Sequence, residues 1–136
     1  MLRNIALGTL AVYWMAIFVG THLPNELPSL EQIDDKILHF GAYAGLAFLL
    51  VAAFKARRLR HGTLLLPLAV AAIYGCVDEL SQKAVPGRQA DVADWAADVL
   101  GAGVGVFAFG VLSLCIAKVS ARPAAPECEA VTKSAA

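Results

Sequence analysis

Four apolar runs dominate the sequence, at residues 5–20, 37–54, 64–77 and 99–117. They are too long and too continuous to be the buried faces of water-soluble helices, which also carry a polar stripe. Because a helix of about 20 residues crosses a hydrocarbon core of about 30 Å, the second and fourth runs are long enough alone. The fourth extends upstream through Trp95, and the third becomes long enough if its helix continues through Gln82. The sequence therefore predicts an all-α fold over residues 1–120, an integral membrane four-helix bundle.

The composition excludes several other classes of protein. Hydrophobic residues make up 59% of the chain and charged residues only 16%, unlike a soluble domain. A nucleic-acid-binding protein would show a basic stripe with aromatic residues, and a disordered chain would combine low hydrophobicity with high net charge. The three cysteines share no short metal-ligand spacing, and we expect Cys76 and Cys115 to be small core residues. We therefore expect membrane lipids as partners and no nucleic acid.

The first apolar run also fits a signal peptide. A short segment with one basic residue, Arg3, precedes it, as in the n-region of such peptides. No small-x-small cleavage site follows, because the run is succeeded by Thr21, His22, Leu23 and Pro24. We therefore interpret this segment as the first span.

The Lys and Arg residues indicate how the chain is oriented. With four spans, one side holds eight basic and two acidic residues, a balance of 8 − 2 = +6. The other side holds three basic and nine acidic residues, a balance of 3 − 9 = −6, so the net charge of zero is a cancellation across the membrane. Since cytoplasmic loops are enriched in Lys and Arg, the first side is predicted to be cytoplasmic. Both the N- and C-termini are therefore expected in the cytoplasm.

The segments between the runs carry signals for helix ends and turns. Residues 29–32 fit a capping box that starts the helix of the second run. Pro86 and Gly87 predict a tight turn, and Asp91 is placed to cap the helix of the fourth run. For residues 121–136 we predict a disordered cytoplasmic tail.

Polar residues recur at helical spacing at the predicted outer ends of three spans. They fall on three stripes, which are Asp35, His39 and Tyr43; Tyr74, Asp78 and Gln82; and Asp91, Asp94 and Asp98. One interpretation is a rim at the level of the lipid headgroups, where Arg88 and Lys36 pair with surplus carboxylates. Since the groups share common helix faces, the other interpretation is a site for acid–base, cation or phosphate chemistry.

Ten residues are candidate members of this site. The candidate catalytic residues are His39, Asp78, Glu79 and Asp94, and the candidate ligand-binding residues are Asp35, Lys36, Tyr43, Gln82, Arg88 and Asp98. His39 titrates near neutral pH and is the expected proton acceptor, paired with Asp78. Its structural alternative is a histidine held for packing by Asp35 or Asp78. Because Asp78 and Glu79 are about 100° apart on a helix, we expect only one of them, Asp78, to point inward.

The charged residues also indicate what class of ligand such a site would take. Arg88 offers a bidentate fork to a phosphate or carboxylate, and its structural alternative is a salt bridge to Asp91 or Asp94. Four carboxylates offer oxygen ligands for a divalent cation, namely Asp78, Glu79, Asp94 and Asp98. No dense local motif such as an EF-hand accompanies them, so we predict no metal site and assign no cofactor.

Several glycines have spacings that let helices approach closely. They are Gly41 and Gly45 in the second run and Gly101, Gly103 and Gly105 in the fourth. Small residues at such positions bring helix backbones into contact. We expect this packing inside the bundle, and a homo-oligomer formed through the Gly-rich faces is the alternative.

Three motifs in register with the apolar runs resemble the VanZ-like membrane protein family. They are Asp35-Lys36-x-x-His39-Phe40-x-x-Tyr43, Tyr74-x-x-x-Asp78-Glu79-x-x-Gln82-x-x-x-Pro86-Gly87-Arg88 and Asp94-x-x-x-Asp98-x-x-Gly101-x-x-x-Gly105. The resemblance covers roughly residues 30–110. The family usually has Asn where this chain has Asp98, which here either adds a negative charge or is held protonated.

The resemblance implies a small multi-pass protein of the bacterial inner membrane. The family's namesake is associated with resistance to the glycopeptide teicoplanin, and glycopeptides act on lipid-linked cell-wall precursors outside the membrane. We therefore expect an outward-facing polar pocket that binds, and as a further step modifies, an anionic envelope ligand such as a lipid or a lipid-linked precursor. The alternatives are a cation or proton pathway and a non-catalytic structural membrane factor.

Overall fold

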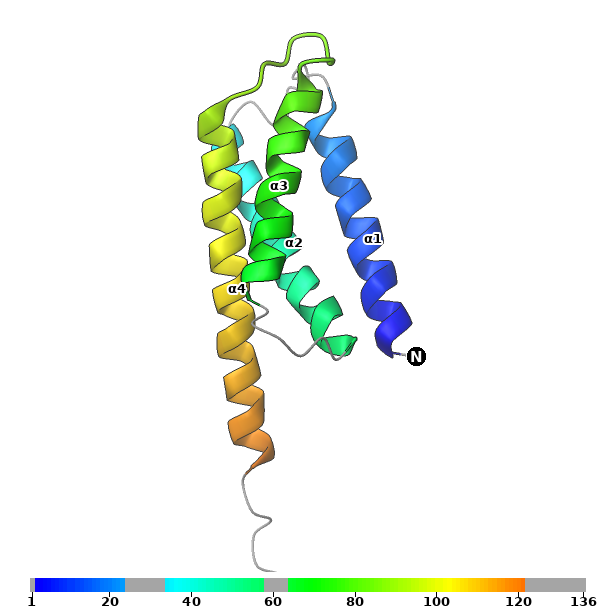
Figure 1. Cartoon of the computed structure of the whole chain (residues 1–136), viewed down its shortest axis with the longest axis vertical. Coiled ribbons are helices and arrows are strands. Elements are labelled where there is room, and N and C mark those ends of the chain that lie inside the picture. Colours follow the sequence, from blue (N-terminus) through cyan, green and yellow to red (C-terminus); the bar gives the residue numbers. More distant parts are fainter. Residues whose placement is uncertain (1, 24–33, 58–63, 122–136) are drawn as a thin grey trace, which may run out of the picture.

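The computed structural model describes residues 2–23, 34–57 and 64–121. Their regular elements are four helices, α1 (Leu2–Thr21), α2 (Asp35–Ala56), α3 (Leu65–Gln82) and α4 (Val92–Ser120). The helices run alternately up and down, so the start of α1 and the end of α4 lie at the same end of the bundle (Figure 1). The prediction of an all-α protein with four helices is confirmed.

The helix ends follow local chemistry. The third helix continues through Gln82, and α4 starts upstream of Trp95, both as predicted. The Asp91 side chain caps α4 by accepting a hydrogen bond from the Ala93 N–H at 2.8 Å. Gly87 has a φ of 81°, which suits the third position of the predicted turn, where the Arg88 N–H donates to the Val85 carbonyl at 3.1 Å.

Two further sequence predictions lie outside the described residues. These are the capping box at 29–32 and most of the predicted tail, from 122 to 136. Within the described part, the N-cap of α2 is Asp34, which accepts a hydrogen bond from the Lys36 N–H at 3.0 Å.

Three of the helices, α1, α2 and α4, are long and apolar enough to cross a membrane. Their outward faces carry large apolar side chains, such as Val12 and Phe107, which are both 72% exposed. Such surfaces are stable where lipid rather than water covers them. Cys76 and Cys115 are exposed as well, so the prediction that they are core residues is wrong. In a membrane-spanning helix, apolar residues occupy every side of the helix. Small residues such as cysteine therefore face lipid as readily as protein.

The most extensive helix contact joins α2 and α4. A Cβ atom added at Gly101 would collide with the Phe40 carbonyl oxygen, and one at Gly105 with that of Ala44. The two backbones therefore touch, which confirms the predicted packing of these glycines inside the bundle. Within the described residues, a Cβ added at Gly41 or Gly103 has nothing within 4 Å, so the prediction is wrong for these two glycines.

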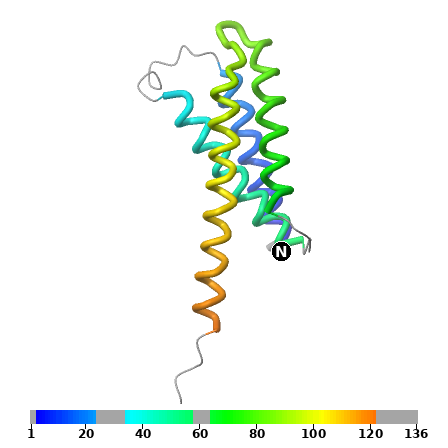
Figure 2. Tube along the Cα trace, turned by 60° about the vertical axis from the view of Figure 1, so that its left-hand side comes forward, coloured from blue at the N-terminus to red at the C-terminus, as the bar shows by residue number. Residues whose placement is uncertain are grey.

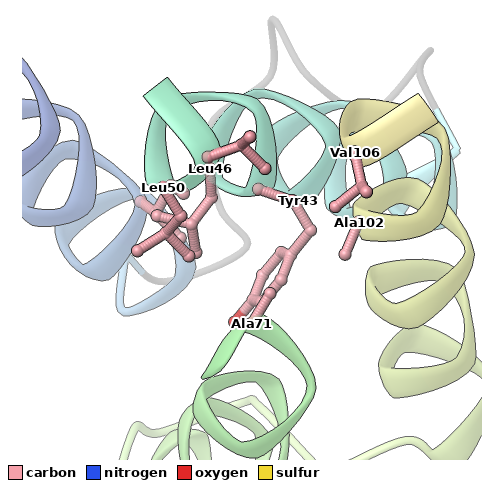
Figure 3. Packing of buried hydrophobic residues seen from close by; sticks show 9 residues of the cluster. Tyr43, Leu46, Leu50, Ala71, Ala102 and Val106 are labelled. Atoms are coloured by element: carbon pink, nitrogen blue, oxygen red, sulfur yellow. The ribbon is translucent and has the colours of Figure 1, made fainter. Parts of the chain in front are cut away.

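An apolar core lies between α2, α3 and α4 (Figure 3). Its central side chains are Tyr43, Leu46, Leu50, Ala71, Ala102 and Val106. Tyr43 extends from α2 towards Ala71 on α3 (Figure 3). The C-terminal turns of α4, a helix about 44 Å long, extend past the ends of the other three (Figure 2). The core residues of α2 and α4 lie in the middle of α2 and in the first half of α4, further from the starts of these helices than His39 and Asp98 do.

Candidate functional site

The ten predicted site residues lie at the end of the bundle where α1 and α3 end and α2 and α4 begin. We call this set the polar end; it comprises Asp35, Lys36, His39, Tyr43, Asp78, Glu79, Gln82, Arg88, Asp94 and Asp98. Six of its polar or charged side chains are buried, namely His39, Asp78, Glu79, Gln82, Asp94 and Asp98. Buried charges in proteins are paired or hydrogen-bonded, so their partners define the chemistry of the site.

His39 pairs with Asp98. His39 Nδ1 lies within hydrogen-bond distance of Asp98 Oδ1, at 2.9 Å, and Glu79 Oε1 lies 3.8 Å from the same nitrogen. The expected partner was Asp35 or Asp78. The contact of Gly101 with the Phe40 carbonyl oxygen sets the register of α2 against α4, and this register places His39 beside Asp98.

Asp78 and Glu79 are both buried, so the prediction that only one of them points inward is wrong. The Gln82 side-chain amide donates to Asp78 Oδ2 at 3.2 Å and to Glu79 Oε1 at 3.1 Å. Asp78 Oδ1 also accepts from the Thr21 hydroxyl on α1 at 3.1 Å, and Glu79 Oε2 accepts from the Asp91 N–H at 2.9 Å. Helix α3 contacts both α1 and α4. Asp78 and Glu79, although they lie on different faces of α3, are therefore both covered by neighbouring helices.

The basic residues of the polar end pair with its outer carboxylates. Lys36 Nζ lies 2.9 Å from Asp94 Oδ1 and 3.2 Å from Asp91 Oδ2. The Ala93 N–H and the Lys36 ammonium together lower the pKa of Asp91. Since Lys36 occupies these two carboxylates, Arg88 has a different partner from the one expected. Its Nη1 lies 3.4 Å from Asp35 Oδ2.

Arg88 also donates to two uncharged acceptors. Its Nε donates to the Leu23 carbonyl at 3.3 Å, and its Nη1 donates to Gln82 Oε1 at 3.4 Å. All three contacts of the guanidinium are long for charge-assisted hydrogen bonds, which are typically about 2.7–2.9 Å. A phosphate or carboxylate placed at Arg88 would therefore compete with weak partners.

Three further residues belong to this network and were not predicted. Thr21 donates to Asp78, and His22 Nε2 lies 2.9 Å from the hydroxyl oxygen of Ser81. Ser81 in turn donates to the Asp78 carbonyl at 2.7 Å. Thr21 and His22 are the first polar side chains after the first apolar run, and that position was the signal available in the sequence.

The geometry supports acid–base chemistry or cation binding. In the tautomer of neutral His39 whose Nδ1–H donates to Asp98, Nε2 is the basic nitrogen. Two groups of side chains also bring three potential metal-ligand atoms within 4.8 Å of one another. The outer group is Asp35, His39 and Asp94, and the inner group is His39, Glu79 and Asp98.

Comparison with known proteins supports the resemblance given by the motifs. A family model described as VanZ/LLP1 matches residues 2–113, well over half of the chain. No curated protein and no solved structure matches the chain. The matched segment contains α1, α2, α3 and most of α4, and with them the whole polar end. Together with the three helices apolar enough to span a membrane, this match shows that the chain is a membrane protein of the VanZ/LLP1 family.

Proposed function

We propose that this protein crosses the bacterial cytoplasmic membrane four times and binds an anionic cell-envelope ligand at its polar end, on the outer face. The ligand class is a lipid headgroup or a lipid-linked precursor. The distribution of Lys and Arg supports this orientation. The alternating directions of the four helices support α3 as a span, although its last turns carry Asp78, Glu79 and Gln82.

The topology gives a direct prediction. With four spans, a green fluorescent protein fused after residue 121 stays in the cytoplasm and fluoresces, whereas alkaline phosphatase at the same point is inactive. Fusions made after Arg88, in the loop between α3 and α4, are expected to show the opposite pair of signals. Equal behaviour at the two fusion points would contradict α4 as a span, and active phosphatase after residue 121 would contradict the orientation.

The observation that carries the proposed function is that Arg88 contacts Asp35 and Gln82, two neighbours of the buried His39–Asp98 pair. Asp35 precedes His39 by one turn of α2, and Gln82 also donates to Glu79, which lies 3.8 Å from His39 Nδ1. Arg88 is held only by long contacts, and its fork suits an anionic oxygen. Lys36 is more firmly paired, with two carboxylates within 3.2 Å. We therefore assign the anion to Arg88. His39, oriented by Asp98, is the proton acceptor for any step that modifies the ligand.

The Arg88→Ala variant tests whether Arg88 binds the anionic ligand. Hydrogen bonds to charged groups contribute about 1.5–3 kcal/mol, so the Arg88→Ala variant is expected to bind the ligand roughly ten- to a hundredfold more weakly. The measurement is mass spectrometry of lipids that co-purify with the protein in mild detergent, followed by titration with vesicles that contain or lack anionic phospholipid. Lys83→Ala is the matched control, because Lys83 is an exposed cation in the same loop.

The melting temperatures of the same samples distinguish a binding role of Arg88 from a structural one. Weaker binding by Arg88→Ala at an unchanged melting temperature, with normal binding by Lys83→Ala, supports the proposal. Equal lipid content in wild type and Arg88→Ala would exclude Arg88 as the anion anchor. A fall in melting temperature that accounts for the lost binding would instead identify the polar end as a structural element.

A further inference from the structure

The buried carboxylates at the polar end are not balanced by positive charge. Asp78, Glu79 and Asp98 are 1%, 5% and 0% exposed. Within the described residues, the Lys and Arg side chains at ion-pairing distance contact the three outer carboxylates, Asp35, Asp91 and Asp94, instead. The groups of the described residues that lie at ion-pairing distance from the inner three and can carry a positive charge are the imidazoles of His39 and His22. Even if both imidazoles were protonated, one buried negative charge would remain, which is costly.

Three of these side chains have the spacing of metal ligands. His39 Nδ1 lies 2.9 Å from Asp98 Oδ1 and 3.8 Å from Glu79 Oε1, and the ligand atoms of the group all lie within 4.8 Å. Ligand atoms held at about 2.1 Å from one cation are separated by roughly 3.0–4.2 Å. Small movements of the Glu79 and Asp98 carboxylates would therefore bring all three atoms onto a common ion.

Two buried polar atoms beside this group have no hydrogen-bond partner among the residues that the structure describes. They are Asp98 Oδ2 and the Tyr43 hydroxyl, and both residues are 0% exposed. Both side chains reach the same place on α3, because a Cβ at Gly75 would lie 2.8 Å from Asp98 Oδ2 and 3.2 Å from a Tyr43 ring carbon. An unsatisfied buried oxygen costs free energy, so it points to a missing cation, proton or water.

We propose that His39, Glu79 and Asp98 bind a divalent first-row transition-metal cation such as Zn²⁺. One imidazole nitrogen with two carboxylate oxygens suits these cations, whereas Mg²⁺ and Ca²⁺ prefer oxygen ligands alone. The ion would replace the proton between His39 Nδ1 and Asp98 Oδ1 and would balance the excess negative charge. In the metal-bound state His39 Nε2 carries the ring proton, so His39 acts as a proton acceptor only in the metal-free state. Three protein ligands leave a coordination position for water or a ligand oxygen.

The surroundings of Glu79 fit this role. The Gln82 amide donates to Glu79 Oε1 and the Asp91 N–H donates to Glu79 Oε2, and such second contacts orient the carboxylates of metal sites. The outer group of potential ligands is less suitable, because Arg88 already pairs with Asp35 and Lys36 with Asp94. The inner site does not require an anionic ligand at Arg88, and the cation binds whether or not that ligand exists.

The test is titration of the full-length protein, purified in detergent and stripped with a chelator, with ZnCl₂, MnCl₂ and MgCl₂ in a calorimeter. One Zn²⁺ per chain is expected, with Mn²⁺ weaker and Mg²⁺ weakest. The conservative variants Glu79→Gln and Asp98→Asn are expected to bind Zn²⁺ at least about tenfold more weakly. Asp35→Asn, which removes a carboxylate from the outer group, is the matched control and is expected to bind as wild type does.

The results can overturn the assignment in three ways. Wild-type protein without saturable Zn²⁺ binding would show that protons, not a metal, balance the cluster. Loss of binding in Asp35→Asn with retention in Glu79→Gln would move the site to the outer group. If the variants do not fold, Co²⁺ added to wild type decides, because weak d–d bands abolished by Zn²⁺ are expected. Intense thiolate charge-transfer bands would place the metal on a cysteine and contradict the proposal.

Discussion

The His39→Ala variant is expected to lose about 3–5 kcal/mol of the free energy of unfolding. His39 is the only imidazole at ion-pairing distance from Asp98 and Glu79 within the described residues, and all three side chains are buried. Removing it leaves the two carboxylates without a group that can carry a positive charge at ion-pairing distance in the low-dielectric interior. The loss is measured by unfolding the protein in mixed micelles of dodecyl maltoside and increasing fractions of sodium dodecyl sulfate, with a chelator present.

The control variants for His39→Ala are His22→Ala and the double variant His39→Ala/Asp98→Asn. His22→Ala removes an imidazole that contacts Ser81 and the Phe18 carbonyl at the more exposed edge of the network, so a smaller loss is expected. The double variant His39→Ala/Asp98→Asn should regain part of the stability, because one of the two unpaired charges is gone. Equal losses in the two histidine variants, or no rescue by Asp98→Asn, would show that the charge of Asp98 does not matter to the fold.

Replacing Gly101 with alanine is the second change with a large expected effect. The new methyl group would collide with the Phe40 carbonyl oxygen, which belongs to the backbone of α2 and cannot turn away as a side chain would. Overpacking in a closely packed interior costs about 1–3 kcal/mol, and here α4 must move away from α2 as a rigid helix. Because this contact sets the register of the two helices, the movement also separates His39 from Asp98.

Gly103→Ala is the matched control for this prediction. Gly103 is on the same helix two residues away, and an added Cβ meets nothing within 4 Å. Alanine is favoured over glycine in a helix by about 1 kcal/mol, so this variant should be as stable as wild type or slightly more so. Thermal melting in detergent compares the two. A Gly101→Ala variant that melts no lower than Gly103→Ala would contradict the close contact of α2 and α4.

The proposed cation and the proposed anionic ligand are connected by charge. Within the described residues, the polar end together with Asp91 contains six carboxylates, and the permanent cations paired with them are Lys36 and Arg88, so an anion would approach a region of excess negative charge. A bound divalent ion would reduce this repulsion and offer an open coordination position to the ligand. Anion binding that depends on added Zn²⁺ would therefore connect the two sites, whereas anion binding without metal would make them independent.

The sequence by itself determined the elements of the fold and which end of the bundle is polar. Apolar runs of span length, caps such as Asp91 and the Pro86-Gly87 turn are local signals, and the four helices follow them to within a few residues. Helical periodicity also placed the polar residues at one end, because alternating helices bring the end of one beside the start of the next. These features depend on residues a few positions apart, which the sequence shows directly.

Only the tertiary structure decided which side chains meet. His39 and Asp98 are 59 positions apart, and their pairing depends on the register that Gly101 and Gly105 set between α2 and α4. The burial of both Asp78 and Glu79, and the outward position of Cys76, depend on how α3 is rotated between its neighbours. Sequence periodicity gives the faces of a helix, but the rotation and axial position of one helix against another follow from backbone contacts between distant residues.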